Sequence, residues 1–369
     1  MKEKLLTFFK KETILCIACL LAALSACIVP PDTAYLGYVD TRVLILLFSL
    51  MAVLAGFRAL GIFDRMANLL LARAKKMRQL ALTLVMLCFF SAMLVTNDVA
   101  LITFVPFTIL LLQRVHLEEK LIPVIVLQTI AANLGSMLTP VGNPQNLYLF
   151  SYYGLSAKMF FSAMLPPFIL STVLILLCCL VFPKEQLSVP EAQVTVDSRR
   201  AVIYGGLFCL AVAMVLRLVP YVLGLTVIVL ALWFLDRHAL KSVDWGLLAT
   251  FAAFFTFSGN LARMEAVRVL FARLLSHGTI LISALTCQII SNVPAAILLS
   301  RFTQDARGLL VGVNVGGAGT LVASLASLIT FREYTRHVPN GGKQFFFLFS
   351  GISFAFLTIL LAAMSFLNG

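Results

Sequence analysis

Charge is scarce in this chain. Asp, Glu, Lys and Arg make up only 12% of its 369 residues, about half of the ~25% that is usual in soluble domains. Hydrophobic residues reach 61%, and several apolar stretches approach or exceed the roughly 18 residues typical of a transmembrane helix. The shortage of charge therefore excludes an ordinary soluble domain and predicts an all-α polytopic membrane protein that sits in a lipid bilayer.

Residues that build catalytic centres are also few. The four histidines are scattered among polar connections, and the eight cysteines lie within or beside apolar stretches. Neither set has the spacing of a metal site, and the sequence has no P-loop for a nucleotide. A membrane-embedded enzyme would need a convergent acid, base or metal set, which this composition does not supply. We expect no enzyme, no ATP-driven pump and no cofactor other than a sodium ion.

The net charge of +12 points either to nucleic-acid binding or to membrane topology. The basic residues stand between apolar spans, as the positive-inside rule describes, and no soluble domain is left to bind nucleic acid. Lys2, Lys4, Lys10 and Lys11 precede an apolar segment over 13–29. This segment resembles a signal peptide, but the many spans that follow favour a first transmembrane helix. We expect a multi-pass protein of the cell inner membrane with a cytoplasmic N-terminus.

Segment 80–112 is apolar except for Thr96-Asn97-Asp98 near its middle. A carboxylate at the bilayer centre costs roughly 2.5–3.5 kcal/mol on insertion scales, so Asp98 indicates function. The segment is longer than the ~20 residues of one crossing. It is either one long tilted span or a re-entrant hairpin of two half-depth helices, and the polar tip at its midpoint favours the hairpin.

Segment 121–150 is interrupted in a different way. Its run 133–146 holds two prolines, two glycines and three asparagines where a membrane helix is expected. Irregular backbone at membrane depth is tolerated only where it is buried in protein or lines a wet cavity. We therefore predict a broken helix that contributes to a binding site.

The second half of the chain repeats these features. Segment 279–300 holds Ser291-Asn292, and segment 308–330 is rich in glycine and serine. Residues 133–148 align without gaps on 314–329, with five identities that include Asn133/Asn314. A count of spans from a cytoplasmic N-terminus places the two hairpin mouths on opposite sides. The repeats are thus predicted to be inverted, as in many secondary transporters.

The predicted organisation has about nine full spans in two membrane halves joined by a cytoplasmic linker. The two halves and the linker are 1–182, 201–369 and 183–200. The hairpins and broken helices within them are 80–112 and 121–150 in the first half, and 279–300 and 308–330 in the second. One further span, 245–257, is predicted to end at Ser258-Gly259-Asn260.

Broken helices place polar groups near the midplane, where helix N-termini attract anions and oxygen atoms coordinate cations. Such residues also serve only for helix packing in some membrane proteins, but Asn97 and Asn292 recur at matched places in the two halves. A sodium ion is expected at Asn97, Asn143 and Asn292. The full set of expected substrate- and ion-binding residues is Thr96, Asn97, Asp98, Thr139, Gly142, Asn143, Asn146, Ser291, Asn292, Gly316, Thr320 and Ser324.

Asp98 has no acidic counterpart, because Val293 takes its place in the second half. Three roles stay open for its carboxylate. It coordinates a coupling cation, carries a proton, or pairs with a local hydrogen-bond donor.

These motifs resemble the ion transporter superfamily, which includes divalent anion/sodium symporters, citrate transporters, arsenite permeases and sodium/proton antiporters. The run 139–146 is similar to the threonine-proline-x-glycine loop of the superfamily. Both tips keep the asparagine of the Ser-Asn-Thr tips of divalent anion symporters but differ at the third position, while Thr96-Asn97-Asp98 and the run 312–327 also resemble arsenite permeases. The resemblance implies a scaffold part, a moving transport part and, in many members, a homodimer.

We therefore expect a secondary active transporter of a small anion, coupled to sodium or protons, that works by alternating access. A di- or tricarboxylate such as citrate or succinate is the leading substrate class. The alternatives within the superfamily are an arsenite or antimonite efflux permease and a sodium/proton antiporter. A channel and a membrane-embedded enzyme are the alternatives from other classes.

Overall fold

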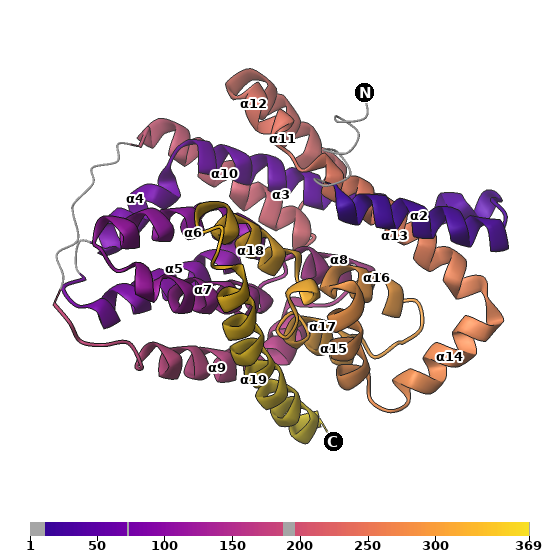
Figure 1. The fold of residues 1–369 in the computed structure, drawn as a ribbon. Coiled ribbons are helices and arrows are strands. Elements are labelled where there is room, and N and C mark those ends of the chain that lie inside the picture. Colours follow the sequence, from indigo (N-terminus) through magenta and orange to yellow (C-terminus); the bar gives the residue numbers. More distant parts are fainter. Residues whose placement is uncertain (1–11, 72–73, 187–195, 369) are drawn as a thin grey trace.

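The computed structural model describes residues 12–71, 74–186 and 196–368, and these are helical almost throughout (Figure 1). Eight of the described helices are long and apolar enough to cross a membrane, or nine if the bent pair Glu265–Leu275 and Thr279–Ile290 counts as one span. The predicted all-α, multi-span fold class is therefore confirmed. The lysine-rich N-terminal residues 1–11 and part of the predicted linker, 187–195, lie outside the described residues.

One group of long helices runs across the upper part of Figure 1. Helix α2 packs along α13, and α3 packs against α10 and α11. Aspartates at the N-caps begin five helices of this group and accept backbone N–H groups of the following turn: Asp32, Asp40, Asp197, Asp236 and Asp244. The group consists of α2 (Thr13–Ile28), η1 (Thr33–Gly37), α3 (Thr41–Ala59), α10 (Ser198–Val215), α11 (Tyr221–Leu235), α12 (Arg237–Lys241) and α13 (Trp245–Arg263).

A second group holds the hairpins and the broken helices, in the same order in each repeat. The first repeat continues from α3 with α4 (Ile62–Leu71), α5 (Met77–Val95), α6 (Asn97–Arg114), η2 (Glu118–Lys120), α7 (Leu121–Gly135), η3 (Ser136–Leu138), α8 (Pro144–Tyr152) and α9 (Ala157–Cys179). The second continues from α13 with α14 (Glu265–Leu275), α15 (Thr279–Ile290), α16 (Asn292–Leu299), α17 (Ala306–Val315), η4 (Leu321–Ala323), α18 (Leu325–His337) and α19 (Gly342–Asn368).

Both hairpin tips bend at one residue with nearly the same backbone angles. Thr96 has φ 72° and ψ 150°, and Ser291 has φ 74° and ψ 157°. Residues other than glycine rarely adopt this conformation, which costs on the order of 1–3 kcal/mol and persists only where the surroundings impose it. The shared geometry shows that the two tips are equivalent parts of one repeated unit.

The arms of the two hairpins differ in length. In the first hairpin, α5 and α6 are each long and apolar enough to cross a membrane alone, so each arm exceeds the half-depth helix that the sequence suggested. The tip between them nevertheless meets the break between α7 and α8, because the Asn97 backbone N–H donates to the Gly142 carbonyl at 3.1 Å. The second return arm, α16, has only 8 residues.

The predicted break at Ser258-Gly259-Asn260 is wrong, because α13 continues to Arg263. The small and polar residues there serve close packing instead. The Ser258 hydroxyl donates to the Ile297 carbonyl at 3.0 Å, and the Asn260 amide donates to Ser25 Oγ at 3.0 Å. The Gly259 Cα faces the Tyr38 ring so closely that a Cβ atom would lie 2.5 Å from it. Such residues are common where membrane helices approach closely.

Gly135 offers a test of the packing around the first broken helix. A Cβ atom at this position would lie 2.3 Å from the Phe89 carbonyl oxygen, a backbone atom of α5. We expect Gly135→Ala to lower the thermal unfolding midpoint in detergent, because overpacking a core costs about 1–3 kcal/mol. Gly206→Ala on α10 is the matched control, since nothing lies within 4 Å of its Cβ position. Equal midpoints for the two variants would contradict this packing.

Candidate functional site

The two hairpin tips meet at a small cavity. It is lined by Asn97 and Asp98 from the first tip and by Ser291 and Asn292 from the second, with Gln145 and Ser324 from the start of α8 and α18. Its volume is about 30 Å³, room for roughly one or two water molecules. We call it the inter-tip cavity. Each of the two repeats supplies polar groups to it.

Each tip asparagine is the first residue of its helix, and its side chain bonds the next backbone N–H. The Asn97 side-chain oxygen accepts the backbone N–H of Asp98 at 3.0 Å, and the Asn292 side-chain oxygen accepts that of Val293 at 2.9 Å. Both asparagines are buried, with 3% of their surface exposed. The equivalence of Asn97 and Asn292 that the sequence suggested thus extends to their hydrogen bonds.

The threonines of the two broken helices also make matching contacts. The Thr139 hydroxyl donates to the Met93 carbonyl, and the Thr320 hydroxyl donates to the Gln288 carbonyl. Met93 precedes Thr96 by the same number of residues as Gln288 precedes Ser291. Each threonine therefore binds the last turn of its own hairpin's first arm to the break in the following helix.

Two buried asparagines join the repeats to each other. The Asn133 side-chain oxygen, at the end of α7, accepts hydrogen bonds from Ser324 Oγ and from the Asn97 amide, each at 2.9 Å. Its amide nitrogen donates to Ser327 Oγ at 2.9 Å. Asn133 thus binds its own hairpin tip and the first turn of α18 in the other repeat.

Asn314, at the end of α17, makes the reciprocal contacts. Its side-chain oxygen accepts from the Asn143 amide at 3.1 Å, and its amide donates to the Asn146 side-chain oxygen at 2.6 Å. The gapless alignment that pairs Asn133 with Asn314 also pairs Asn143 with Ser324 and Asn146 with Ser327. We call these four cross-repeat contacts the asparagine exchange. Its symmetry is that of two repeats related by a twofold axis.

Seven of the predicted site residues line a cavity. Asn97, Asp98, Ser291, Asn292 and Ser324 line the inter-tip cavity, and Thr96 and Asn143 line the larger space described below.

The other five predicted residues lie behind the cavities and hold the breaks in shape. The Asn146 amide donates to the Met137 and Thr139 carbonyls, each at 3.1 Å. A Cβ atom on Gly142 would lie 2.1 Å from the Ser136 carbonyl oxygen, and one on Gly316 would lie 2.7 Å from the Ala284 Cα atom. Thr139 and Thr320 make the hydrogen bonds given above, and these five residues line neither of the two cavities.

Sequence reasoning missed three kinds of site residue. Asn133 and Asn314 were aligned with each other but not recognised as a link between the repeats. Gln288 holds the second break, because its amide donates to the Gly316 and Ala318 carbonyls at 2.8 and 3.0 Å. Gln145 and Thr250 line the inter-tip cavity. The Asn133/Asn314 identity was the one signal available, because the other three lack a counterpart in the repeat.

A much larger cavity leads to the tips from one face. Its volume is about 1080 Å³, and it lies between α3, α6, α13 and α18. It shares Asp98 and Pro144 with the inter-tip cavity. The exposed residues Arg58 and Lys241 lie at its outer end, beside His238 and Asp244. We call it the vestibule, and it reaches Thr96 and Asp98 of the first tip.

The three asparagines expected to hold a sodium ion do not converge on one point. Asn97 and Asn292 line the inter-tip cavity, whereas Asn143 lines the vestibule. The Asn143 amide is engaged with Ser136 Oγ and Asn314, and its oxygen accepts the Asn146 backbone N–H. These residues therefore do not fit a single sodium ion held by all three.

Asp98 is the one charged side chain among the described residues that line the inter-tip cavity. It is half-buried and also faces the vestibule. No described residue donates a hydrogen bond to its carboxylate. A local donor, the third role left open above, is therefore not seen among the described residues.

The asparagine exchange predicts a large effect of removing Asn133. Asn133→Ala leaves Asn97, Ser324 and Ser327 without this partner in a buried place. An unsatisfied buried polar group costs about 1–3 kcal/mol, so the thermal unfolding midpoint should fall. Asn314→Ala should behave alike. Thr226→Ala is the control, because this exposed hydroxyl bonds only the Val222 carbonyl one turn away; a midpoint for Asn133→Ala equal to that control would refute the exchange.

Comparison with known proteins supports transport. Residues 5–306 match the family model described as a citrate transporter. An uncharacterized transporter of Methanocaldococcus jannaschii is 31% identical over 329 residues, which cover 88% of this chain and 89% of that protein. The inner membrane protein YbiR of Escherichia coli is 32% identical over 302 residues, 80% of each chain. The silicon efflux transporter LSI3 of Oryza sativa is 30% identical over 154 residues, 41% of this chain and 31% of that protein.

A solved structure shares the fold. The YdaH transporter of Alcanivorax borkumensis superimposes with a TM-score of 0.57, covering 96% of this chain and 97% of its own. At 13% identity this likeness concerns the fold alone. The match of the family model over most of the chain, together with relatives above 30% identity along most of their length, shows that this multi-pass membrane protein is a transporter and belongs to the citrate transporter family.

Proposed function

We propose that the chain is a secondary active transporter that binds its solute where the vestibule reaches the hairpin tips and carries it by alternating access. One observation carries this proposal. The inter-tip cavity is built from both repeats, and it shares the lining residues Asp98 and Pro144 with the vestibule. Inverted repeats that meet at a central site are the architecture in which such transporters expose one site to two sides in turn.

The vestibule is proposed to face the cytoplasm. Arg58 and Lys241 lie at its outer end, and basic residues favour the cytoplasmic side of a membrane. The same rule supports an inner-membrane location with the N-terminus in the cytoplasm. The structure then corresponds to an inward-facing state of the transport cycle.

The division into moving and fixed parts follows the packing. We propose that α2, α3, α10, α11 and α13 form the scaffold, and that the hairpins and broken helices move against it as the transport part. The asparagine exchange supports this division, because it binds the broken helices of both repeats into one unit. A homodimer stays a prediction.

The lining favours a small solute rich in oxygen atoms. Asn97, Asn292, Gln145 and Ser324 offer uncharged donors and acceptors. A di- or tricarboxylate such as citrate or succinate would bring negative charge close to Asp98, so it needs a compensating positive charge. A sodium ion or proton taken up at Asp98 supplies that charge and couples solute movement to the ion gradient.

A neutral oxyacid exported from the cell is a second candidate. It is favoured by the lack of a lysine or arginine among the described residues that line the inter-tip cavity. A relative over 41% of this chain is a silicon efflux transporter. The arsenite permeases considered from the sequence belong to the same class of solute, and a sodium/proton antiporter would use Asp98 without an organic solute.

The tip asparagines test the site. Asn97→Ala and Asn292→Ala should each reduce uptake into proteoliposomes by tenfold or more. An effect of this order is expected when a buried, well-placed hydrogen-bonding group is removed. The exposed Asn340 in the turn before α19 provides the control Asn340→Ala, which should transport normally. Normal uptake by both tip variants, with all proteins folded, would exclude the hairpin tips from the site.

Asp98 tests the coupling. We expect Asp98→Asn to abolish the dependence of transport on the sodium or proton gradient, because the amide carries no charge to compensate a cation. The measurement is uptake of labelled citrate and of silicic acid, with sodium and pH varied separately. Transport by Asp98→Asn that still follows the gradient would exclude Asp98 as the coupling residue.

A further inference from the structure

The face opposite the vestibule carries the loop 30–40. Helices α2 and α13 run side by side in the same direction, since Ser25 near the end of α2 bonds Asn260 near the end of α13. The residues that precede or begin them, Glu12 and Trp245, line the vestibule. Their last turns, and the first turn of α3, therefore lie at the other face, where the loop connects α2 to α3.

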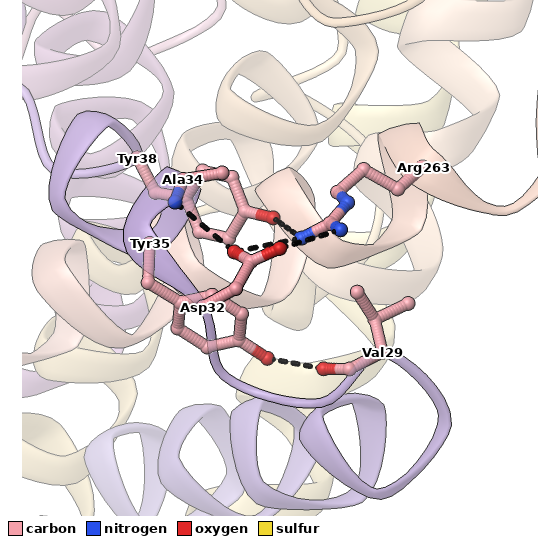
Figure 2. A network of polar contacts seen from close by, with 6 residues as sticks. All are labelled: Val29, Asp32, Ala34, Tyr35, Tyr38 and Arg263. Carbon is pink, nitrogen blue, oxygen red and sulfur yellow. Dashed lines mark hydrogen bonds and ion pairs between the residues drawn. The ribbon is translucent and has the colours of Figure 1, made fainter.

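An arginine from the end of α13 holds this loop (Figure 2). The Arg263 guanidinium donates to both carboxylate oxygens of Asp32, at 3.1 and 2.8 Å, and to the Tyr38 hydroxyl at 3.1 Å. The hydrogen bond from Arg263 holds the pKa of the Asp32 carboxyl below its ordinary value, so the carboxylate stays charged. A single exposed ion pair contributes little, but two parallel bonds and a third partner fix the geometry.

Tyr38 is the part of the loop that reaches inward. Its side chain is 8% exposed, and its ring lies against Gly259 of α13, where a Cβ atom would be 2.5 Å away. The ring of Tyr35 lies 4.9 Å from it, and the Tyr35 hydroxyl donates to the Val29 carbonyl at 2.5 Å. Tyr38 is thus held from three sides.

A second arginine connects Tyr38 to the second hairpin. Arg301, just after α16, donates to the Tyr38 carbonyl at 3.1 Å and lies over the Tyr152 ring of α8 at 5.4 Å. Beside it, the Tyr148 hydroxyl and Ser300 Oγ are 2.7 Å apart. The ends of α8 and α16 are therefore bound together, and Arg301 fastens them to the loop.

A third arginine on the same face reaches α8 from the scaffold. Arg217 lies in the turn between α10 and α11 and donates to the carbonyls of Phe150 and Gly154 at 3.0 and 3.1 Å. Its backbone has φ 63°, the left-handed region that few residues other than glycine adopt. The nearby Tyr221 ring lies beneath Arg42 of the first turn of α3, which places Arg217 on the loop side.

We propose that Arg263, Arg301 and Arg217 form a latch that keeps the face opposite the vestibule closed and that must release before that face opens. Arg263 holds the loop 30–40, and Arg301 and Arg217 fasten the ends of α16 and α8 to the scaffold. The latch rests on the proposed alternating access. Weakening it is expected to shift the population away from the state with an open vestibule, because in this proposal only that state makes these contacts.

The test measures access to the vestibule directly. A reporter cysteine, Val99→Cys, lines the vestibule and lies outside the inter-tip cavity. Its rate of labelling by a membrane-impermeant maleimide is measured from each side, in intact cells and in inside-out vesicles, and the native cysteines are subtracted with the protein that lacks the reporter. In the otherwise unchanged protein, labelling is expected from the vestibule side.

Arg301→Gln and Arg263→Gln should each slow this labelling by roughly fivefold or more. A factor of about five is the low end of the effect that one site typically has on the equilibrium at another. Arg268→Gln is the matched control, because its exposed pair with Glu265 at 3.2 Å lies on α14 and leaves the loop untouched. If Arg263→Gln does not fold, Asp32→Asn removes the same ion pair more mildly. The charge exchange Asp32→Arg with Arg263→Asp should restore the original rate.

Equal labelling rates in the latch variants and Arg268→Gln would overturn the latch. Uptake measured on the same proteins separates the two proposals. Transport without any change in labelling leaves the proposed function standing and rejects the latch. A change in labelling without transport of any tested solute keeps the latch as a conformational device and counts against the proposed function.

Discussion

The asparagine exchange is the interaction on which the rest of the structure depends. Asn133 and Asn314 are both buried, and each binds the first turn of the second half of the other repeat's broken helix. Buried polar groups must be paired inside a membrane protein, where no water replaces a lost partner. Asn133 and Asn314 each find two of their side-chain partners in the opposite repeat, so each break depends on a contact with the other. This constraint sets the register of the two repeats and brings both hairpin tips to one place.

The site that results is symmetric in shape and asymmetric in charge. Thr96 and Ser291 have the same strained backbone, and the Asn97 and Asn292 side-chain oxygens each accept the backbone N–H of the next residue. Asp98 and Val293 then differ at the next position. In the proposed function this one carboxylate takes up the coupling cation, and the polar groups of the two tips bind the solute. The matched tips thus determine where the inter-tip cavity lies, and Asp98 gives its two sides a different charge.

The two faces of the molecule are built differently. The vestibule face leaves a large cavity beside Arg58 and Lys241, whereas on the opposite face three arginines are bound to carboxylate and carbonyl oxygens. Citrate transporter family membership agrees with a protein that has one central site and two unlike faces. The proposed alternating access requires such a difference between the faces, because a site open to both sides at once would dissipate an ion gradient.

The sequence by itself determined the membrane class, the helical fold, the tips at Asn97 and Asn292 and the gapless equivalence of the two broken helices. Each of these follows from local pattern, since apolar length and misplaced polar residues depend on neighbours along the chain. Only the tertiary structure decided that α13 continues through Ser258-Gly259-Asn260, that Asn143 lies apart from the inter-tip cavity, and that Arg263 binds Asp32. These depend on partners far apart in sequence, such as Ile297, Asn314 and Asp32. A small or polar residue looks the same in a sequence whether it breaks a helix, packs it or joins it to another repeat, and only its contacts distinguish the three.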